Sequence, residues 1–426
     1  MPTPLPIDNF HIESFRGLRD VTLQRLARCN LLVGKNNCGK TSVLEALAMF
    51  AAPLEPSTWA ATAGKREGRY RSAAGRSVPI DSIRWLFPAV NADQGNAANV
   101  ELSGDGSWFL RQVRVSAAQI RGIPPQPPPP VQQPAVPASP SLLAKALHVL
   151  FRDVQIRQVG RQVAMTIGPA PDPARGERDE QEGLRLTVFS TPASVKLAHG
   201  ELSFDDRNAD PAAPALELDL WPSRGFARLV SSNDRSLPAQ YLPPYSHRDE
   251  PMQARRYSDL ARNAPAYQME IENILKQLDP NVSRLQLLTE GSNNEPVLFV
   301  DYAGHGSVPV RIVGDGLRRA LSIALAVRRA RGGLLLIDEI ETALHTSALD
   351  QFFPWLLQIC EDNDVQLFAT THSLEAIAAL ARALPDDKVD ALATYRLEVT
   401  AEKTIVHRHG GKALERLVLE SGLDVR

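Results

Sequence analysis

An eight-residue pattern near the N-terminus constrains this chain more than any other feature. The segment from Gly34 to Thr41 reads G-x-x-x-x-G-K-T and lies between the short apolar run NLLV and the apolar-periodic run TSVLEALAMFAA. A pattern of this kind between a strand and a helix is a P-loop. Its two glycines permit backbone geometry that a side chain would forbid, so successive N–H groups can converge on phosphate oxygens at the helix N-terminus.

The residue types in this loop predict a nucleotide site. Lys40 is expected to reach the β- and γ-phosphates, and the Thr41 hydroxyl is expected to ligate Mg²⁺. The predicted nucleotide-binding residues are Gly34, Lys35, Asn36, Asn37, Cys38, Gly39, Lys40, Thr41 and Ser42.

A second motif, GGLLLIDEIETALH, supplies two carboxylates. The four apolar residues from Leu334 to Ile337 are typical of a buried parallel strand, which would deliver Asp338 and Glu339 at its C-terminal end. We expect Asp338 to hold Mg²⁺ and Glu339 to orient and polarise an attacking water. Taken alone, the motif is also compatible with a buried strand that simply ends in exposed acids.

Two further segments carry candidate site residues. His372 follows the apolar strand VQLFATT and is a candidate γ-phosphate sensor, because open α/β sheets bind ligands at strand C-termini. Gly314, Asp315 and Gly316 begin a strong helical pattern, which offers a second anion-binding helix N-terminus. The ordinary alternatives are a cap or core histidine and a glycine-rich N-cap.

Composition narrows the class of protein. The net charge is -2, from 47 basic and 49 acidic residues, so any contact with nucleic acid must come from a local patch. Three cysteines without a CxxC pair indicate neither a disulfide framework nor a zinc site. The N-terminus lacks the features of a signal peptide, and no apolar run has the length of a membrane span. We therefore expect a cytoplasmic protein without a membrane partner.

Patterning along the 426 residues divides the chain into four segments. Residues 1–56 hold a predicted hairpin, the P-loop and its helix. Residues 57–245 are expected to form a β-rich lobe with a proline-rich loop at 124–140, and residues 246–300 a helical segment followed by strands. Residues 301–426 alternate helix-like and strand-like patterns and end in a strand and a last helix.

At this point the motifs resemble, in order as well as in kind, the ABC-type ATPases of the SMC/RecF and OLD (overcoming-lysogenization-defect) group. FHIESFRGLRDVTL is similar to their opening hairpin, GKNNCGKT to their Walker A, and VGDGLRR to their signature segment. LLLIDEIETALH is similar to their Walker B with D-loop, and TTHS to their switch histidine. The resemblance covers both ends of the chain well and the middle poorly.

The resemblance implies an α/β fold, a P-loop NTPase with an ABC-type ATPase head. Its mixed, largely parallel sheet would be flanked by helices, with an antiparallel β lobe and a helical insertion. It also implies that Lys40, Thr41, Asp338, Glu339 and His372 act within one subunit. Gly314 to Gly316 and the loop from Thr342 to His345 would meet a second subunit, so that ATP is sandwiched across a homodimer or higher oligomer.

The chain departs from this family pattern in two places. Where the ABC signature has a serine before its paired glycines, this chain has Gly314, so a hydroxyl that would meet the γ-phosphate in trans is missing. The Q-loop glutamine has no assignment, because Gln94, Gln112 and Gln119 all lie in irregular sequence.

OLD nucleases carry a Toprim domain after the switch histidine, and the remaining residues here hold no acidic cluster of that kind. The resemblance is therefore to the stand-alone ATPases of the group, which are often encoded beside a separate nuclease or other effector in bacterial anti-phage defence.

We therefore predict a Mg²⁺-dependent ATPase that acts as a nucleotide-driven switch. The alternative is a scaffold or sensor that holds ATP with negligible turnover; a transporter subunit is disfavoured by the atypical signature and the long insertion. GTP is a weaker candidate, because the chain lacks an [N/T]KxD segment.

DNA is a candidate partner through the basic segment 65–71; the alternative for this segment is a solvated loop. The proline-rich loop is either a ligand for an aromatic groove or a lobe insertion without a partner.

Overall fold

We describe the fold from a computed structural model of the chain. The structure describes residues 3–64, 80–88, 98–122, 154–159, 162–167, 180–192, 196–198, 201–203, 216–221, 224–226, 236–290, 295–304, 306–384, 386–400 and 403–420. The basic segment 65–71, the proline-rich loop 124–140 and Gln94 lie outside these residues.

A six-stranded sheet holds the P-loop. Its strand order is β13-β17-β18-β3-β19-β20, parallel except for the antiparallel edge strand β20. The P-loop strand β3 and the strand of the second motif, β17, are separated by β18. Their bounds are Ala239–Leu242 (β13), Leu334–Ile337 (β17), Gln366–Thr370 (β18), Cys29–Val33 (β3), Leu392–Val399 (β19) and Thr404–Gly410 (β20).

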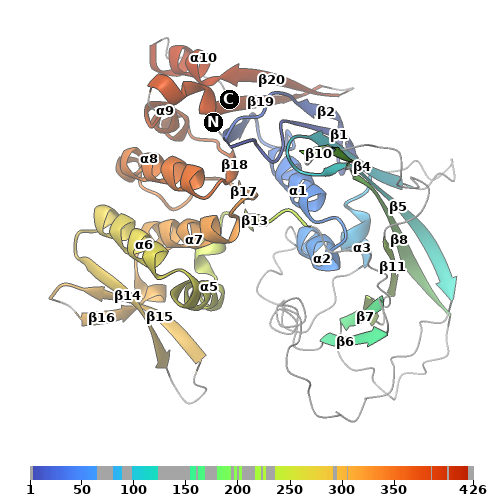
Figure 1. Ribbon diagram of the computed structural model, residues 1–426, viewed down its shortest axis with the longest axis horizontal. Coiled ribbons are helices and arrows are strands. Elements are labelled where there is room, and N and C mark those ends of the chain that lie inside the picture. Colours follow the sequence, from blue (N-terminus) through green and yellow to red (C-terminus); the bar gives the residue numbers. More distant parts are fainter. Residues whose placement is uncertain are drawn as a thin grey trace.

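Both faces of this sheet are covered, as the unbroken apolar runs predict. In β3, Leu32 belongs to one hydrophobic core, whereas Leu31 and Val33 belong to the other. Helix α1 packs on the first face, and helices α7, α8 and α9 lie on the opposite side (Figure 1). Their bounds are Lys40–Ala51 (α1), Asp315–Arg329 (α7), Thr346–Asp362 (α8) and Leu374–Arg382 (α9).

A seven-stranded antiparallel sheet forms the predicted β lobe and packs through the core that contains α1. Its order is β12-β11-β8-β5-β4-β1-β2. The strands are Asn9–Phe15 (β1), Leu18–Leu23 (β2), Ala98–Asp105 (β4), Leu110–Gly122 (β5), Gln181–Pro192 (β8), Leu216–Trp221 (β11) and Arg224–Phe226 (β12). Two short helices also lie in this part of the chain, Pro56–Gly64 (α2) and Ile80–Arg84 (α3), and two small hairpins pair Val154–Val159 (β6) with Gln162–Ile167 (β7) and Lys196–Ala198 (β9) with Glu201–Ser203 (β10).

Some strands pair in a different sheet from the one that their sequence segment suggests. The opening hairpin β1–β2 precedes the P-loop strand but pairs with β4 in the antiparallel sheet. Conversely, β13 lies within the predicted lobe segment but pairs with β17 in the P-loop sheet. The reason is that hydropathy patterns predict strands but not their partners, which are set by long-range packing.

The segment after β13 contains a helical segment followed by strands, as expected. Pro265 separates two helices, because it takes the first position of the second one, where its missing N–H costs nothing. The elements are Ser246–Arg248 (η4), Glu250–Asn263 (α5), Pro265–Leu278 (α6), Val282–Glu290 (β14), Glu295–Tyr302 (β15), Gly306–Pro309 (β16) and Val310–Ile312 (η5). The C-terminal part ends in η6 (Asp386–Ala391), β20, α10 (Gly411–Glu415) and a π-helical turn at Arg416–Glu420 (η7).

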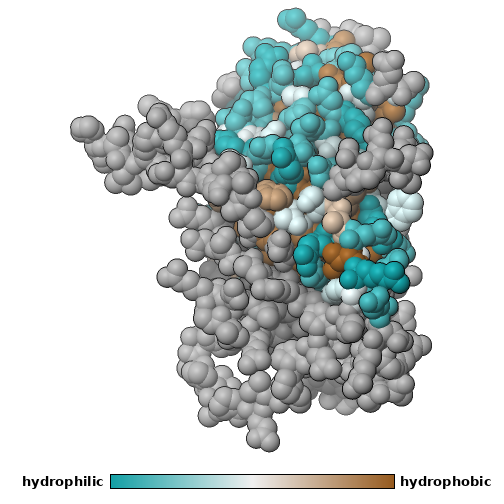
Figure 2. Space-filling model, turned by 90° about the vertical axis from the view of Figure 1, so that its right-hand side faces the viewer, coloured by the Kyte–Doolittle hydropathy of each residue, from teal (hydrophilic) through white to brown (hydrophobic). Residues whose placement is uncertain are grey.

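The predicted fold class is therefore confirmed: a mixed, largely parallel P-loop sheet flanked by helices, with an antiparallel β lobe. Figure 2 shows that hydrophilic residues dominate the upper part of one face, with small brown patches among them. None of the helices in the described residues combines the length and apolar composition that crossing a bilayer requires.

Candidate nucleotide site

The P-loop connects β3 to α1 with the backbone that its glycines permit. Gly34 and Gly39 have φ values of 140° and 96°. A Cβ on Gly34 would lie 2.5 Å from the Leu397 carbonyl oxygen, and one on Gly39 would lie 2.5 Å from Leu18 Cδ2. Glycine is therefore required at both positions by backbone conformation and by space.

Lys40 is buried inside this loop. Its Nζ donates to the carbonyl oxygens of Gly34 and Lys35, at 2.7 and 2.9 Å, and lies 3.7 Å from Cys38 Sγ. The side chains of Lys35, Asn36 and Asn37 are exposed, whereas Cys38 and Ser42 are buried. The ammonium group thus lies at the centre of the loop, where three donors on a flexible stem can turn toward an anion.

Asp338 brings the two predicted motifs together. Its Oδ1 accepts hydrogen bonds from Thr41 Oγ1 at 3.2 Å and from Thr370 Oγ1 at 2.6 Å. Its Oδ2 accepts one from Tyr241 OH at 3.3 Å. The two residues expected to hold Mg²⁺, Thr41 and Asp338, are therefore neighbours, although 297 positions separate them in the sequence.

Glu339 is held in an unusual backbone conformation. Its φ is 48°, which costs a non-glycine residue about 1–3 kcal/mol. The Glu339 N–H donates to Thr370 Oγ1 at 2.8 Å, and Thr342 Oγ1 donates to Glu339 Oε2 at 2.9 Å. Backbone and carboxylate are thus each fixed by a threonine, which gives the carboxylate a defined direction.

His372 lies where the sequence predicts it, just beyond the C-terminal end of β18 and between the strands that carry the two motifs. Its backbone N–H donates to Glu341 Oε1 at 2.9 Å. Glu341 Oε2 is buried and has no hydrogen-bond partner among the described residues. Glu341 therefore links the loop after β17 to the loop after β18.

The signature-like segment forms the start of α7, with Gly314 as N-cap. The Asp315 carboxylate lies 3.2 Å from Arg318 Nη1, 3.4 Å from Arg248 Nη2 and 3.6 Å from His247 Nε2. Burial raises the pKa of Asp315, but these neighbouring positive charges outweigh that effect and leave it below its ordinary value. A Cβ on Gly316 would lie 3.0 Å from the Ala343 carbonyl oxygen, so this segment touches the loop from Thr342 to His345 within the same chain.

Arg319, on the second turn of α7, is fully buried. Its Nη2 donates to the carbonyl oxygens of Asp338 and Glu339, at 3.0 and 3.2 Å. Burial lowers the pKa of Arg319 to about 10, partly opposed by the nearby carboxylates of Asp338, Glu341 and Glu339. A buried cation therefore lies directly behind the two acidic residues of the second motif.

Three residues of this site are missing from the sequence prediction. Thr370 ends a predicted strand at the ligand-binding edge, so its hydroxyl could have been identified from position alone. Arg319 falls on the apolar stripe of α7 with Ile323, and a cation on a buried stripe is a recognisable signal. Tyr241 carried no comparable signal, because its contact depends on the pairing of β13 with β17.

The donor set fits a magnesium ion. Thr41 Oγ1 and Asp338 Oδ1 are hard oxygen donors at hydrogen-bond distance from each other. Mg²⁺ is commonly held by one or two protein oxygens together with substrate phosphates and waters. Within the described residues no group of three or more His, Cys, Asp or Glu side chains offers an all-protein cage. All three cysteines are buried and free.

Two family models match the segments that build this site. Residues 6–86, which contain the P-loop, match a model described as "AAA ATPase domain". Residues 175–378, which contain Asp338, Glu339 and His372, match a model described as "AAA domain, putative AbiEii toxin, Type IV TA system". The P-loop and the acidic motif therefore lie in two separate segments, each of which is similar to a model of an AAA-type domain.

Two relatives with similar sequences match short parts of the chain. An uncharacterized protein of Methanocaldococcus jannaschii is 47% identical over 49 residues, which are 12% of this chain and 22% of that protein. An ATP/GTP phosphatase of Helicobacter pylori is 32% identical over 114 residues, which are 26% of this chain and 30% of that protein. The chain thus spans less than a third of either relative.

A solved structure was also compared with this chain. It is an Smc head domain from Pyrococcus furiosus, bound to the C-terminal domain of ScpA. The alignment covers 99% of this chain and 100% of the chain in that structure, with a TM-score of 0.43 and 10% identity.

Proposed function

We propose that the chain binds ATP with Mg²⁺ and hydrolyses it, and that turnover drives a conformational switch. One observation carries this proposal: the side chains of Thr41, in the P-loop, and Asp338, directly after β17, meet at 3.2 Å, with Glu339 as the next residue. This contact is not required if the first motif is only a glycine turn and the second only the end of a buried strand. The AAA ATPase model that matches the P-loop segment supports the same activity.

The chain's own residues have separate roles in this reaction. The N–H groups of the loop from Gly34 to Lys40 bind the phosphates, and Lys40 exchanges its carbonyl partners for phosphate oxygens. Thr41 and Asp338 would hold Mg²⁺, which neutralises charge on the phosphates when it is bound. Glu339, fixed by Thr342, accepts a hydrogen bond from the attacking water and orients it toward the γ-phosphate.

His372 and the start of α7 complete the proposal. His372 contacts the γ-phosphate from the end of β18, which makes the loop after β18 sensitive to hydrolysis. Gly314, Asp315 and Gly316 meet the nucleotide of a second subunit in an ATP-dependent homodimer or higher oligomer. Support for this comes from the position of Gly314 on the surface and from the contact between Gly316 and the loop that contains Ala343.

The biological role is proposed from resemblance. The chain acts as an ATPase of the OLD group together with a separately encoded nuclease or other effector, or with DNA, in anti-phage defence or DNA maintenance in the cytoplasm. The description of the model matched by residues 175–378 names a Type IV TA system, and this is the observation that favours a role in defence. Co-purification with the products of neighbouring genes tests this part, and the absence of any association would refute it.

The hydrolysis proposal is tested by measuring phosphate release from ATP per subunit across a series of protein concentrations. Glu339→Gln removes the carboxylate charge at nearly constant shape, and Glu361→Gln serves as a matched control on the exposed surface of α8. We expect wild type and control to hydrolyse ATP with a rate per subunit that rises with concentration, and Glu339→Gln to lose the activity.

The alternative is a scaffold that holds ATP without turnover. It is favoured by one observation: Gly314 stands where the family pattern has a serine, so the hydroxyl that would meet the γ-phosphate in trans is missing. Hydrolysis by wild type no faster than by Glu339→Gln at every concentration, together with measurable ATP binding, would support the scaffold and refute the switch.

A further inference from the structure

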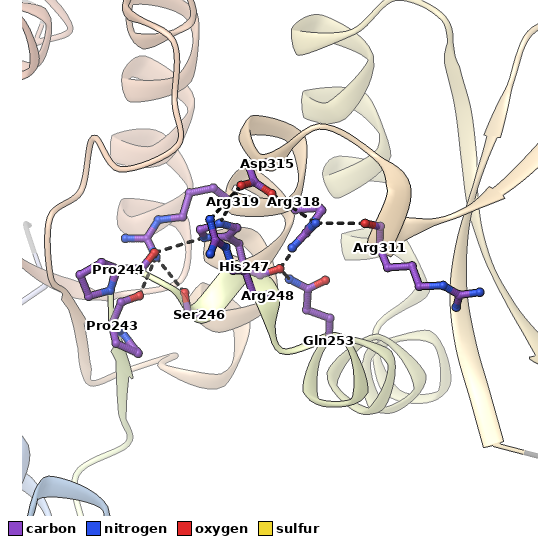
Figure 3. Close-up of polar contacts among 10 residues, drawn as sticks. All are labelled: Pro243, Pro244, Ser246, His247, Arg248, Gln253, Arg311, Asp315, Arg318 and Arg319. Atoms are coloured by element: carbon purple, nitrogen blue, oxygen red, sulfur yellow. Dashed lines mark hydrogen bonds and ion pairs between the residues drawn. The ribbon is translucent and has the colours of Figure 1, made fainter. Parts of the chain in front are cut away.

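Arg319 connects three elements from a fully buried position. Its Nη1 donates to the Pro243 and Pro244 carbonyl oxygens at 2.8 and 3.3 Å, and to Ser246 Oγ at 2.8 Å. Figure 3 shows this guanidinium reaching from α7 toward the segment that follows β13. Its Nη2 reaches the carbonyl oxygens at the end of β17. The planar fork therefore joins α7, the end of β13 and the end of β17.

The partners of Arg319 are unusual for a buried guanidinium. Four of its five recorded acceptors are backbone carbonyl oxygens, and the fifth is a hydroxyl. A buried cation is normally compensated by a hydrogen-bonded carboxylate, because the loss of hydration is costly. Here backbone carbonyl oxygens accept most of the hydrogen bonds from the guanidinium. The direction of those carbonyls therefore depends on the position of the guanidinium.

Two of these carbonyls flank the residue with the strained backbone. The Asp338 carbonyl precedes the Glu339 nitrogen, and the Glu339 carbonyl follows its Cα. Thr370 holds the intervening N–H at 2.8 Å. The φ of 48° at Glu339 is therefore fixed from both sides, by Thr370 on the amide and by Arg319 on the carbonyls.

The same helix begins with the signature-like segment. Arg319 lies one turn after Asp315 on α7, and Gly316 packs against the Ala343 carbonyl oxygen in the loop after Glu339. The neighbouring Arg318 donates to the carbonyl oxygens of His247 and Arg311 and so holds the start of the helix against these two segments (Figure 3). A displacement at the start of α7 would consequently move the guanidinium that orients the Glu339 backbone.

We propose that Arg319 is a positioning residue that sets the direction of the Glu339 carboxylate and links it to the start of α7. This inference rests on the proposed function, because it assigns Arg319 a part in the same ATP hydrolysis. Arg319 acts through the backbone at positions 338 and 339, whose carbonyl oxygens accept its hydrogen bonds.

The test uses Arg319→Lys and Arg319→Met in the full chain. Lysine keeps a positive charge but cannot bond two groups of carbonyls at once, since it lacks the planar fork. We expect both variants to lower kcat by about 100-fold, the scale of a catalytic group misplaced by about 1 Å. KM for ATP should change by less than about twofold, because a loss of kcat alone marks an interaction made in the transition state.

Arg16→Lys controls for the general effect of losing a buried guanidinium. Arg16 lies 2.8 Å from Glu45 of α1, and both side chains are buried. Its Nη2 also donates to the Thr62 carbonyl oxygen, so these two partners lie in α1 and α2, outside the second motif. Arg16→Lys should lower the unfolding midpoint and leave kcat within about threefold of wild type, as expected of a residue with no part in the transition state.

Amide hydrogen exchange provides a readout that does not depend on hydrolysis. Ile340 N–H donates to the Thr370 carbonyl, and Thr342 N–H donates to the Glu339 carbonyl, both at 3.0 Å. In Arg319→Lys these amides should exchange faster, while the amides of the P-loop helix α1 keep their wild-type rates. Faster exchange in Arg319→Lys, combined with a wild type that does not hydrolyse ATP, would refute the proposed function and keep the role of Arg319 in positioning the Glu339 backbone. Unchanged exchange at 340–342, or wild-type kcat in both variants, would overturn the positioning role.

Discussion

Replacing Thr370 by valine tests how the site holds its two acidic residues. The Thr370 hydroxyl donates to Asp338 Oδ1 and accepts from the Glu339 N–H, and the side chain is buried. Valine has nearly the same shape, so the change removes these two bonds and little else. A hydrogen bond to a charged group contributes about 1.5–3 kcal/mol, and a buried amide left without a partner costs about 1–3 kcal/mol. We expect the free energy of unfolding to fall by about 2.5–6 kcal/mol, the sum of these two contributions.

Thr394 provides the matched control. It lies in β19, it is fully buried, and its hydroxyl has no hydrogen-bond partner in the described structure. Thr394→Val should therefore leave the free energy of unfolding unchanged or raise it by up to about 2 kcal/mol, because an unpaired hydroxyl is costly to bury. Urea denaturation with comparable m-values measures both changes. If Thr370→Val were no more destabilising than Thr394→Val, the account of Thr370 would be refuted.

Three further changes give separate predictions. Gly34→Ala should abolish the rise in Tm on adding ATP and lower the Tm of the free protein, because its Cβ would lie 2.5 Å from the Leu397 carbonyl oxygen. Tyr241→Phe should lower the free energy of unfolding by only about 0.5–1.5 kcal/mol, since its bond to Asp338 is long at 3.3 Å; a larger loss in urea denaturation would contradict this. Burial, with nearby arginines, lowers the pKa of His247 below 6.5, so the unfolded chain binds more protons and stability is lost as pH falls below 6.5. His247→Gln should therefore lose less stability than wild type between pH 7.5 and 5.5, which urea midpoints at the two pH values measure.

The sequence was sufficient to predict the site residues that lie at the C-terminal ends of parallel strands. Thr41 follows the P-loop strand and Asp338 follows another apolar run, and parallel strands place their C-terminal ends at one edge of a sheet. The shared edge of these two residues could therefore be predicted, whereas their contact depends on the strand order, in which only β18 lies between β17 and β3. The helix pair around Pro265 was equally predictable, because proline is tolerated at the first position of a helix.

What the sequence did not predict depends on pairing between distant segments. The β1–β2 hairpin reads as an edge next to the P-loop strand, but its partner is β4, which begins at Ala98. Arg319 is one of two adjacent arginines in α7, and the sequence does not state that its guanidinium meets the carbonyls of β17. Such contacts are set by tertiary packing, which periodicity does not encode.

The segment at the start of α7 allows the missing serine to be restored. Gly314 has a φ of -55°, which any residue adopts, and a Cβ built there meets nothing within 4 Å. It is also the N-cap of α7 and makes no side-chain cap hydrogen bond. Serine is preferred at this position, with an advantage of a few tenths of a kcal/mol over glycine. Gly314→Ser should therefore fold as well as wild type.

The expected gain lies in assembly. If Gly314 faces the γ-phosphate of a second subunit, the new hydroxyl adds one charge-assisted hydrogen bond per site. A bond worth about 1.5 kcal/mol corresponds to more than tenfold at each of the two sites of a symmetric dimer. Sedimentation velocity of Gly314→Ser in the Glu339→Gln background, with and without ATP, measures the dimer dissociation constant. Tighter association only when ATP is present would support a composite site. Equal association with and without ATP would show that the start of α7 does not meet a nucleotide in trans, and hydrolysis would then have to be explained within one subunit.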